Sequence, residues 1–183
     1  MGDDALELET RRKIYETIRK FPGLHLRELA RQLEMSVPLV DYHLNFLEKY
    51  GIVTGIQDEQ YKRFYPRDPI GAEQKTDVLS ADEKRVMALL RQRIPLQIVL
   101  FLLKNGSAQH REMVPVMGIS ASTLSHHLNK LARRGILQKS AAGEERGYRL
   151  SNEGQIAKLL LHYAPPPGTL VDSFIEIWEE FHQ

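Results

Sequence analysis

Residues 27–53 read RELARQLEMSVPLVDYHLNFLEKYGIV, and residues 111–137 read REMVPVMGISASTLSHHLNKLARRGIL. The two stretches align without a gap at an offset of 84 positions. A repeat of this length indicates two tandem copies of one small structural unit. Each copy has a short helical pattern, a turn and a longer helical pattern, which is the helix-turn-helix order. The identical pairs are Arg27/Arg111, Glu28/Glu112, Ser36/Ser120, His43/His127, Leu44/Leu128, Asn45/Asn129, Leu47/Leu131, Gly51/Gly135 and Ile52/Ile136.

The composition of the chain is that of an ordinary globular protein, with 42% hydrophobic and 27% charged residues among 183. It has no cysteine, so disulfides, thiolate metal sites and cysteine nucleophiles are excluded. The N-terminus is acidic and has no hydrophobic signal core, and the longest apolar run, Ile94 to Leu103, is too short to span a bilayer. We therefore expect a cytoplasmic protein.

The net charge of +1 conceals an uneven distribution. Residues 84–149 hold 12 Lys and Arg against 3 Asp and Glu, a balance of +9, and residues 11–67 hold 11 against 7, or +4. Residues 150–183 hold 1 against 5, or −4. Basic charge on both copies of the repeat suits a polyanion such as DNA, although solvated Lys and Arg on helix faces would give the same count.

In the first copy, apolar spacing predicts helices over 7–20, over 27–34 and from the N-cap Ser36 to Tyr50. The third helix keeps Val40, Leu44 and Leu47 on one face and ends at Gly51. Strands over 52–57 and 61–65 then form a hairpin. Three helices followed by a hairpin is the winged-helix order.

The second copy predicts the same elements with additional helices around them. A capping box of Ser80 and Glu83 begins a helix over about 81–92, and Pro95 opens a buried helix to 104. The repeat then gives helices over 109–117 and 120–134 and strands over 136–141 and 146–150. Two further helices are expected at about 153–163 and 169–182, with PPPG at 165–168 between them.

These patterns predict two domains of a mainly α fold with small β-hairpin wings, that is, an α+β chain of two tandem winged helix-turn-helix domains. The N-terminal winged-helix domain covers 1–67. Residues 68–79 lose periodicity and contain Pro and Gly, so they read as a linker. The C-terminal winged-helix domain covers 80–183 and includes the extra flanking helices.

In a winged helix, the third helix enters the major groove and the hairpin lies along the DNA backbone. The second copy fits this task, because Leu124, Leu128 and Leu131 face inward and short polar side chains face outward. Ser and Asn side chains can bond base edges and phosphates. Its candidate DNA-binding residues are Ser122, Thr123, Ser125, His126, Asn129, Lys130, Arg133 and Arg134 on the helix and Arg146 and Arg149 on the wing.

The first copy fits the task less well, because its outward positions include Val37, Asp41 and Tyr42. Its candidate DNA-binding residues are Tyr42 and Asn45 on the helix and Lys62 and Arg63 in a wing that interleaves basic and aromatic residues. The histidines at one repeat position, His43 and His127, are interpreted as partly buried rings bonded to backbone, with a phosphate contact as the alternative. We expect the second copy to be the stronger reader of bases.

The stretches STLSHHLNKLARRGIL (122–137) and PLVDYHLNFLEKYGIV (38–53) resemble the recognition helix and following strand of ArsR/MarR-type winged-helix regulators. Those regulators have a Ser-x-His-Leu-x-x-Leu pattern, which Ser125-His126-His127-Leu128 matches and Asp41-Tyr42-His43-Leu44 lacks at its first residue. Two such copies without an appended ligand domain are similar to the tandem winged-helix regulators of archaea. The resemblance implies a transcriptional regulator that binds double-stranded DNA, and flanking helices that build a homodimer.

A different class of function remains open. Tandem winged helices also serve as protein-interaction subunits of chromosome or transcription complexes, and the acidic C-terminal segment suits that role. We expect no enzyme, because the sequence has no glycine-rich phosphate loop, metal constellation or nucleophile elbow. No metal site or cofactor is expected, since the histidines show no ligand spacing, and no residue selects an effector.

Overall fold

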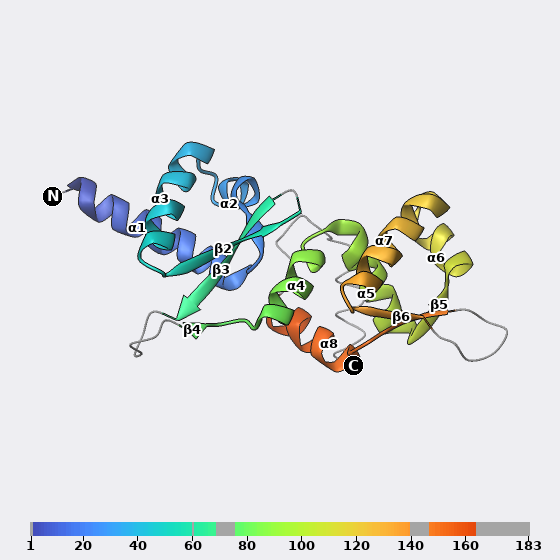
Figure 1. The fold of residues 1–183 in the computed structure, drawn as a ribbon. Helices are drawn as coiled ribbons and strands as arrows, with labels where there is room; N and C mark the ends of the chain where they lie inside the picture. Colours follow the sequence, from blue (N-terminus) through green and yellow to red (C-terminus); the bar gives the residue numbers. More distant parts are fainter. Residues whose placement is uncertain (1, 60, 69–75, 140–146, 164–183) are drawn as a thin grey trace. The chain divides into compact units, whose positions relative to one another are not determined.

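The computed structural model describes residues 2–59, 61–68, 76–139 and 147–163 (Figure 1). The chain divides into two compact units, residues 1–88 and 89–183. Both are mainly helical and each contains a small antiparallel sheet, which is an α+β arrangement. Among the described residues, no single helix is long and apolar enough to cross a membrane. The two helices Ala81–Leu90 and Arg93–Asn105 reach that length and composition only when taken together, and they are bent by 103°.

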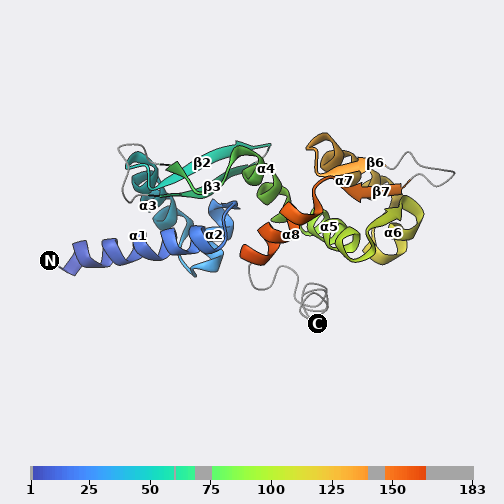
Figure 2. The same cartoon turned by 90° about the horizontal axis from the view of Figure 1, so that it is seen from below.

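The first unit contains three helices and a hairpin. These are α1 (Gly2–Lys20), α2 (Leu26–Gln32), α3 (Val37–Lys49), β2 (Val53–Asp58) and β3 (Tyr61–Asp68). Two-residue strands β1 (Leu24–His25) and β4 (Thr76–Asp77) both pair with β3, so β3 is central in the sheet order β1-β3-β2. Figure 2 shows α1 and α2 on one side of the β2–β3 hairpin.

The hydrophobic core of this unit joins the three helices to β1, β2 and β3. Ile14 and Ile18 come from α1, and the inward positions of α3 predicted from the sequence, Val40, Leu44 and Leu47, are buried. Leu29 of α2 and Phe64 of β3 belong to the same buried cluster. The apolar side chains recur at spacings of three and four on each helix, so burial of one face fixes how the helices meet.

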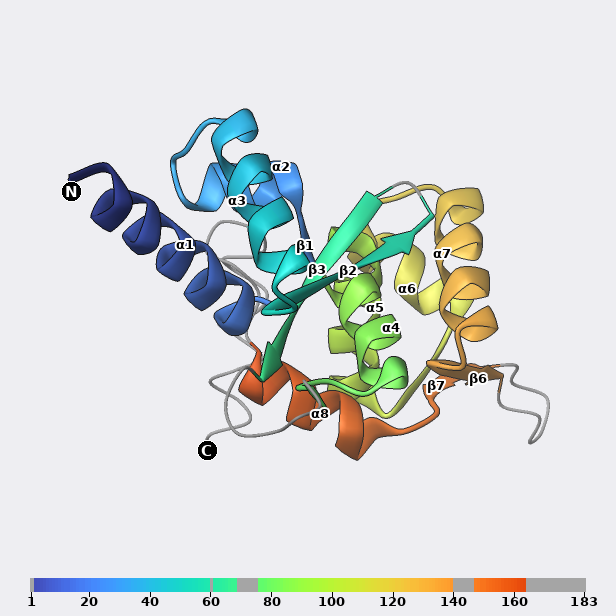
Figure 3. The ribbon, with the colours of Figure 1, turned by 60° about the vertical axis from the view of Figure 1, so that its left-hand side comes forward.

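The second unit repeats this order with additional helices. Its central elements are β5 (Ser107–Gln109), α6 (His110–Met117), α7 (Ala121–Arg133), β6 (Leu137–Lys139) and β7 (Gly147–Leu150). β7 lies between β5 and β6. Figure 3 shows α7 leading into β6 and β7 at its C-terminal end. Its flanking helices are α5 (Arg93–Asn105) and α8 (Glu153–His162), and α4 (Ala81–Leu90) contains the division between the units.

The two units match at the residue level. α3 and α7 both have 13 residues and begin at positions 37 and 121, which preserves the offset of 84 found in the sequence. α2 and α6 each begin with a capping box, formed by His25 with Glu28 and by Gln109 with Glu112. Glycines follow both long helices, and Gly51 and Gly135 have φ of 63° and 73°, which an L side chain adopts only with strain. These helix starts, capping boxes and glycines therefore recur at the positions that the sequence alignment pairs.

The boundary between the units differs from the predicted linker over 68–79. Residues 76–77 form β4, and the division falls between Ala88 and Leu89, inside α4. The Asp77 carboxylate forms ion pairs with Arg67 of β3 and with Lys84, near the N-terminal end of the next helix. The Tyr65 hydroxyl donates to the Lys84 carbonyl over 3.0 Å. These contacts hold the beginning of α4 to the first unit, and charged pairs of this kind leave no sequence periodicity.

Several predicted boundaries move by one to three residues. α4 ends at Leu90 rather than at 92, and α5 begins at Arg93, two residues before Pro95. Both bonds of the Ser80–Glu83 capping box are present, at 2.8 and 3.2 Å. Ser36 has N-cap backbone geometry, but its side chain makes no capping hydrogen bond. The predicted helix over 169–182 and the tip of the second hairpin lie outside the described residues.

Candidate nucleic-acid interface

The sequence of α7 explains both its start and its two faces. Ser120 accepts a hydrogen bond from the Thr123 backbone N–H over 3.1 Å, which satisfies one donor of the first turn. Leu124, Leu128 and Leu131 are fully buried and lock the helix to its unit, as predicted. The side chains on the opposite face are exposed, and they are Ser122, Thr123, His126, Asn129 and Arg133.

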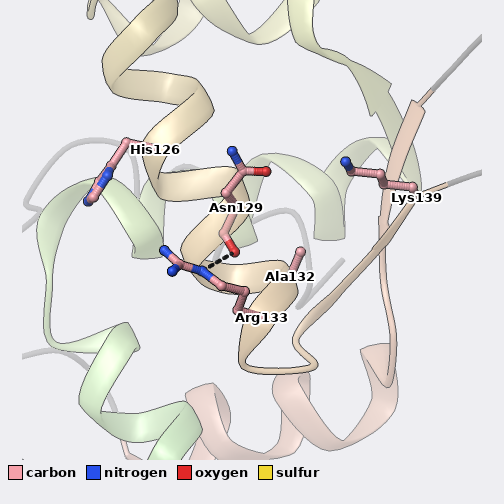
Figure 4. Close-up of a pocket in the computed structure, with 5 residues that line it drawn as sticks. All are labelled: His126, Asn129, Ala132, Arg133 and Lys139. Atoms are coloured by element: carbon pink, nitrogen blue, oxygen red, sulfur yellow. Dashed lines mark hydrogen bonds between the residues drawn. The ribbon is translucent and has the colours of Figure 1, made fainter.

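The C-terminal half of α7 and the strand after it line an open surface hollow of about 630 Å³. Figure 4 shows its five lining residues, which are His126, Asn129, Ala132, Arg133 and Lys139. The Arg133 Nε donates to the Asn129 carbonyl over 3.4 Å, which leaves the rest of the guanidinium toward solvent. The lining thus combines two permanent cations, an amide and an imidazole, and a carboxylate is not among these five residues.

Two predicted DNA-binding residues at the start of α7, Ser122 and Thr123, make hydrogen bonds within the protein. The hydroxyls of Ser122 and Thr123 lie 3.0 and 2.8 Å from Ser120 Oγ, although both residues are exposed. Ser125 was expected to face outward, but it is half-buried, and its Oγ lies 2.9 Å from His110 Nε2. The same nitrogen lies 3.1 Å from the Ala121 carbonyl oxygen. Ser125 therefore joins α6 to α7.

The remaining basic candidates of the second unit differ in exposure. Lys130 is half-buried, and its Nζ donates to Gln92 Oε1 over 3.3 Å, so it packs toward the start of α5. Arg134 is the C-cap of α7 and is also half-buried. Arg149 is exposed on β7, where it donates across the strands to Gln138 over 3.4 Å. Arg146 lies outside the described residues.

The outward face of α3 is more apolar than that of α7. Tyr42 and Asn45 are exposed, as their predicted role requires, and the Asn45 amide donates to Asp41 over 3.5 Å. Val37, Leu39 and Tyr42 expose 39%, 43% and 56% of their surface. This face offers aromatic and aliphatic contact area where α7 offers hydroxyl, amide and cationic groups.

Arg63, a predicted DNA contact, is buried in the structure. Arg63 lies in β3 and exposes 3% of its surface, and it bonds within the first unit. Its guanidinium donates to Asp58 over 3.0 Å and to the Gly23 carbonyl over 2.8 Å. A sequence that alternates basic and aromatic residues does not show which side of the strand faces the core, and here Arg63 and Phe64 are both buried.

Lys62 remains exposed, but its charge is partly neutralised. Its Nζ lies 2.7 Å from Glu48 Oε2 and 5.6 Å from the centre of the Phe64 ring. Arg67 pairs with Asp77 over 3.2 Å. The first hairpin is consequently a set of internal ion pairs rather than the basic surface that the sequence predicts.

The two equivalent histidines are structural. His43 is buried and His127 half-buried, and the Nδ1 atom of each has no hydrogen-bond partner among the described residues, contrary to the expected backbone bond. Burial lowers the pKa of His43, and the positive charge of Arg11 adds to the effect. Burial also lowers the pKa of His127, with His126 and Lys130 as further causes. Both rings therefore favour the neutral form.

The sequence analysis did not predict that Lys139 and Ala132 line the hollow beside α7. Lys139 stood in a predicted strand with no assigned role, and Ala132 has no chemistry of its own. The signal was available in the alignment of the repeats, where Ala132 takes the place of Glu48 and Lys139 that of Gly55. Within the described residues, three or more His, Cys, Asp and Glu side chains nowhere gather as a metal site would require.

Two protein families match successive parts of this chain. Residues 8–76 match a family described as an N-terminal HTH domain. Residues 83–163 match the N-terminal domain of the methanogenesis regulatory protein FilR1. Together with the order of helices, these matches define a helix-turn-helix protein similar to transcription regulators.

A curated relative agrees with this class. The chain is 28% identical over 144 residues to a protein of Methanocaldococcus jannaschii named as an uncharacterized HTH-type transcriptional regulator. The match covers 78% of this chain but only 34% of that relative, so this chain spans about a third of the longer protein.

Two solved structures share a distant resemblance. One is the endosomal complex ESCRT-II, at 15% identity and a TM-score of 0.32, with 81% of this chain and 65% of that chain covered. The other is ScpB from Mycobacterium tuberculosis, at 13% identity and a TM-score of 0.27, with 79% and 91% covered. Similarity this low carries no argument about fold or function.

Proposed function

We propose that this protein is a DNA-binding transcriptional regulator of the tandem winged-helix, ArsR/MarR-like kind. One observation carries the proposal, which is the outward face of α7. Its exposed hydroxyl, amide, imidazole and guanidinium groups stand on a helix that three buried leucines hold rigidly. The matches to helix-turn-helix families support the same reading.

The proposed mechanism places α7 in the major groove. An α-helix fits that groove, and short polar side chains near its axis reach the edges of the bases. Asn129 and His126 are the base readers in this arrangement, and Arg133 and Lys139 bind the phosphates beside them. Arg149 on β7 extends the phosphate contacts along the wing. Positively charged contacts of this kind provide affinity, whereas the base contacts provide sequence preference.

The first unit has a secondary role in this proposal. Its third helix carries Tyr42 and Asn45 outward but sets Asp41 beside them, and the hairpin cations are paired internally. A carboxylate near the backbone repels phosphate unless it accepts from a cytosine amino group. The second unit is therefore the main reader of sequence. The protein acts as a homodimer in the cytoplasm on double-stranded DNA, without enzymatic activity and without a cofactor.

Selection from genomic DNA tests the proposal most directly. Purified protein is mixed with sheared genomic DNA of its source at moderate salt, and the retained fragments are sequenced. A recurring motif, with half-sites about one helical turn apart, is the expected result. Uniform retention indicates an architectural role, and absence of retention contradicts the proposal.

The repeat supplies a matched pair of variants for the role of α7. His126→Ala with Asn129→Ala removes the two proposed base readers of α7, and Tyr42→Ala with Asn45→Ala changes the equivalent positions of α3. Removing one base-reading side chain costs about 1–3 kcal/mol of discrimination, so the first variant should lower specific affinity at least tenfold. Equal reductions for both variants, or a larger reduction for the α3 variant, would reject α7 as the main reader.

The alternative function is that of a winged-helix protein-interaction subunit in a chromosome or transcription complex. Leu39 and Tyr42 favour it, because these two exposed side chains lie three residues apart on α3, and neighbouring apolar side chains on a helix are suited to a protein partner. Replacing Leu39 and Tyr42 by Ser separates the two functions. Under the alternative this variant loses its protein partner, whereas under the main proposal it retains sequence-specific DNA binding.

A further inference from the structure

The hollow beside α7 has an equivalent place in the first unit, and the two places differ in charge. At the offset of 84, the lining residues His126, Asn129, Ala132, Arg133 and Lys139 correspond to Tyr42, Asn45, Glu48, Lys49 and Gly55. The amide and the following cation are kept. The change from Glu48 to Ala132 removes a carboxylate, and the change from Gly55 to Lys139 adds a cation.

In the first unit, the carboxylate of Glu48 occupies this place. Its Oε1 accepts from the Gly55 backbone N–H over 3.1 Å, and its Oε2 pairs with Lys62 Nζ over 2.7 Å. The side chains also fill the space above Gly55, because a Cβ there would collide with Lys62 and lie 2.5 Å from Glu48 Oε1. The first unit therefore provides its own anion at this position.

In the second unit, the corresponding space is open. Ala132 ends at its Cβ, so no side chain of α7 reaches from position 132 toward β6 as Glu48 reaches toward β2. Lys139 and Arg133 are both exposed beside the hollow of about 630 Å³. Asn129 and His126, the proposed base readers, line the same hollow. Two cations beside an open space provide complementary charge for a small anion.

We propose that this hollow binds a phosphate group, and that the DNA backbone supplies it. In the first unit Glu48 takes the place of that phosphate. The chain then binds the backbone at this point through the second unit only. The DNA source rests on the proposed function, whereas the phosphate chemistry rests on the residues of the hollow, and the two can be tested separately.

The test is a pair of substitutions at one position. Ala132→Glu introduces the carboxylate of the first unit, and Ala132→Gln introduces a side chain of nearly the same size without charge. Binding to a fluorescent random-sequence duplex is measured over a range of salt concentrations. We expect Ala132→Glu to weaken binding about tenfold and to reduce the salt slope by about one to two. Ala132→Gln should weaken binding less than about threefold by the same measure.

Two results would overturn the inference. One is an equal weakening with Glu and Gln, which would mean that bulk rather than charge matters. The other is unchanged binding and salt slope in Ala132→Glu. Lys139→Gln is a second variant on an exposed residue, and it should reduce the salt slope by about one without changing the thermal midpoint. An unchanged slope in Lys139→Gln would also count against the hollow.

Inorganic phosphate identifies the source of the anion. Its binding is measured by calorimetry with the wild-type protein and with Ala132→Glu. Weaker DNA binding by the variant, with or without weaker binding of free phosphate, supports a backbone phosphate. A reduction confined to inorganic phosphate assigns the hollow to a free phosphate and excludes it from the DNA interface. If the wild-type protein binds no duplex, the proposed function fails, and the calorimetry alone decides whether the hollow binds phosphate.

Discussion

At the residue scale, Arg63 shows how burial changes the role of a basic side chain. Its guanidinium lies between Asp58 and the Gly23 carbonyl, and Glu28 Oε2 lies 4.0 Å away. Loss of one partner from a buried pair leaves a charge without compensation, which usually costs several kcal/mol. Arg63 thus links α2, β1 and the hairpin of the first unit.

We expect Arg63→Met to lower the free energy of unfolding by about 3 kcal/mol or more, because Asp58 loses its buried partner. Lys62→Met is the neighbouring control, and it should cost less than about 1 kcal/mol, since the Lys62–Glu48 pair is partly exposed. Urea unfolding measures both. A stable Arg63→Met protein that binds DNA weakly would instead restore Arg63 as a DNA contact.

The buried histidines predict a dependence of stability on pH. The folded pKa of His43 and that of His127 lie below the ordinary value of 6.5, so the unfolded chain takes up these protons at higher pH than the folded chain. The contribution of the two neutral histidines to the free energy of unfolding is therefore fully present above about pH 6.5. It is lost as the pH falls below that value. Arg11 opposes protonation of His43, whereas Glu7 favours it.

His43→Leu combined with His127→Leu should reduce the loss of stability between about pH 7.5 and about pH 5. Leucine suits both positions, because neither Nδ1 has a hydrogen-bond partner among the described residues. Urea midpoints at the two pH values give the comparison with the wild-type protein. The same fall in midpoint in the variant would show that other groups account for the acid sensitivity.

At the element scale, the turn before the long helix has a different residue in each unit. Gly118 ends α6 with φ of 61°, and Glu34 occupies the equivalent position in the first unit with φ of 54°. The left-handed region costs a residue with a Cβ about 1 kcal/mol, whereas glycine adopts it freely. The first turn is therefore strained, and the second is not.

Glu34→Gly should raise the free energy of unfolding by about 0.5–1 kcal/mol, since relief of the strain exceeds the added freedom of the unfolded chain. The reciprocal Gly118→Glu should destabilise by about 1 kcal/mol, although nothing lies within 4 Å of a Cβ there. Thermal and urea unfolding check the signs. A destabilised Glu34→Gly would mean that the Glu34 side chain itself contributes to the fold.

At the scale of the whole molecule, two helix-turn-helix units in one chain raise the question of assembly. The regulators that the sequence resembles pair through flanking helices, and the predicted helix over 169–182 has Trp178 on a wide apolar face. We therefore predict a homodimer with twice the chain mass of 21.1 kDa. Sedimentation at several concentrations checks this, and a constant mass of one chain would contradict it.

The sequence by itself determined the repeat, the order of the helices and hairpins, and the inward positions of α3 and α7. These features are encoded locally, because apolar spacing, caps and glycines act within a few residues of one another. Leu44 and Leu128 are examples, since spacing alone places both in the core. The polar outer face of α7 follows from the same periodicity.

The tertiary structure alone decided which polar groups are available to a ligand. Ser125 and Lys130 turn toward His110 and Gln92, and Arg63 is buried, because partners distant in the sequence come within hydrogen-bond reach only after folding. The open hollow beside Ala132 also depends on packing, since its walls come from α7 and β6. The charge distribution in the sequence indicated a polyanion as partner. Burial and ion pairing within the fold determined which basic side chains are exposed and able to bind such a partner.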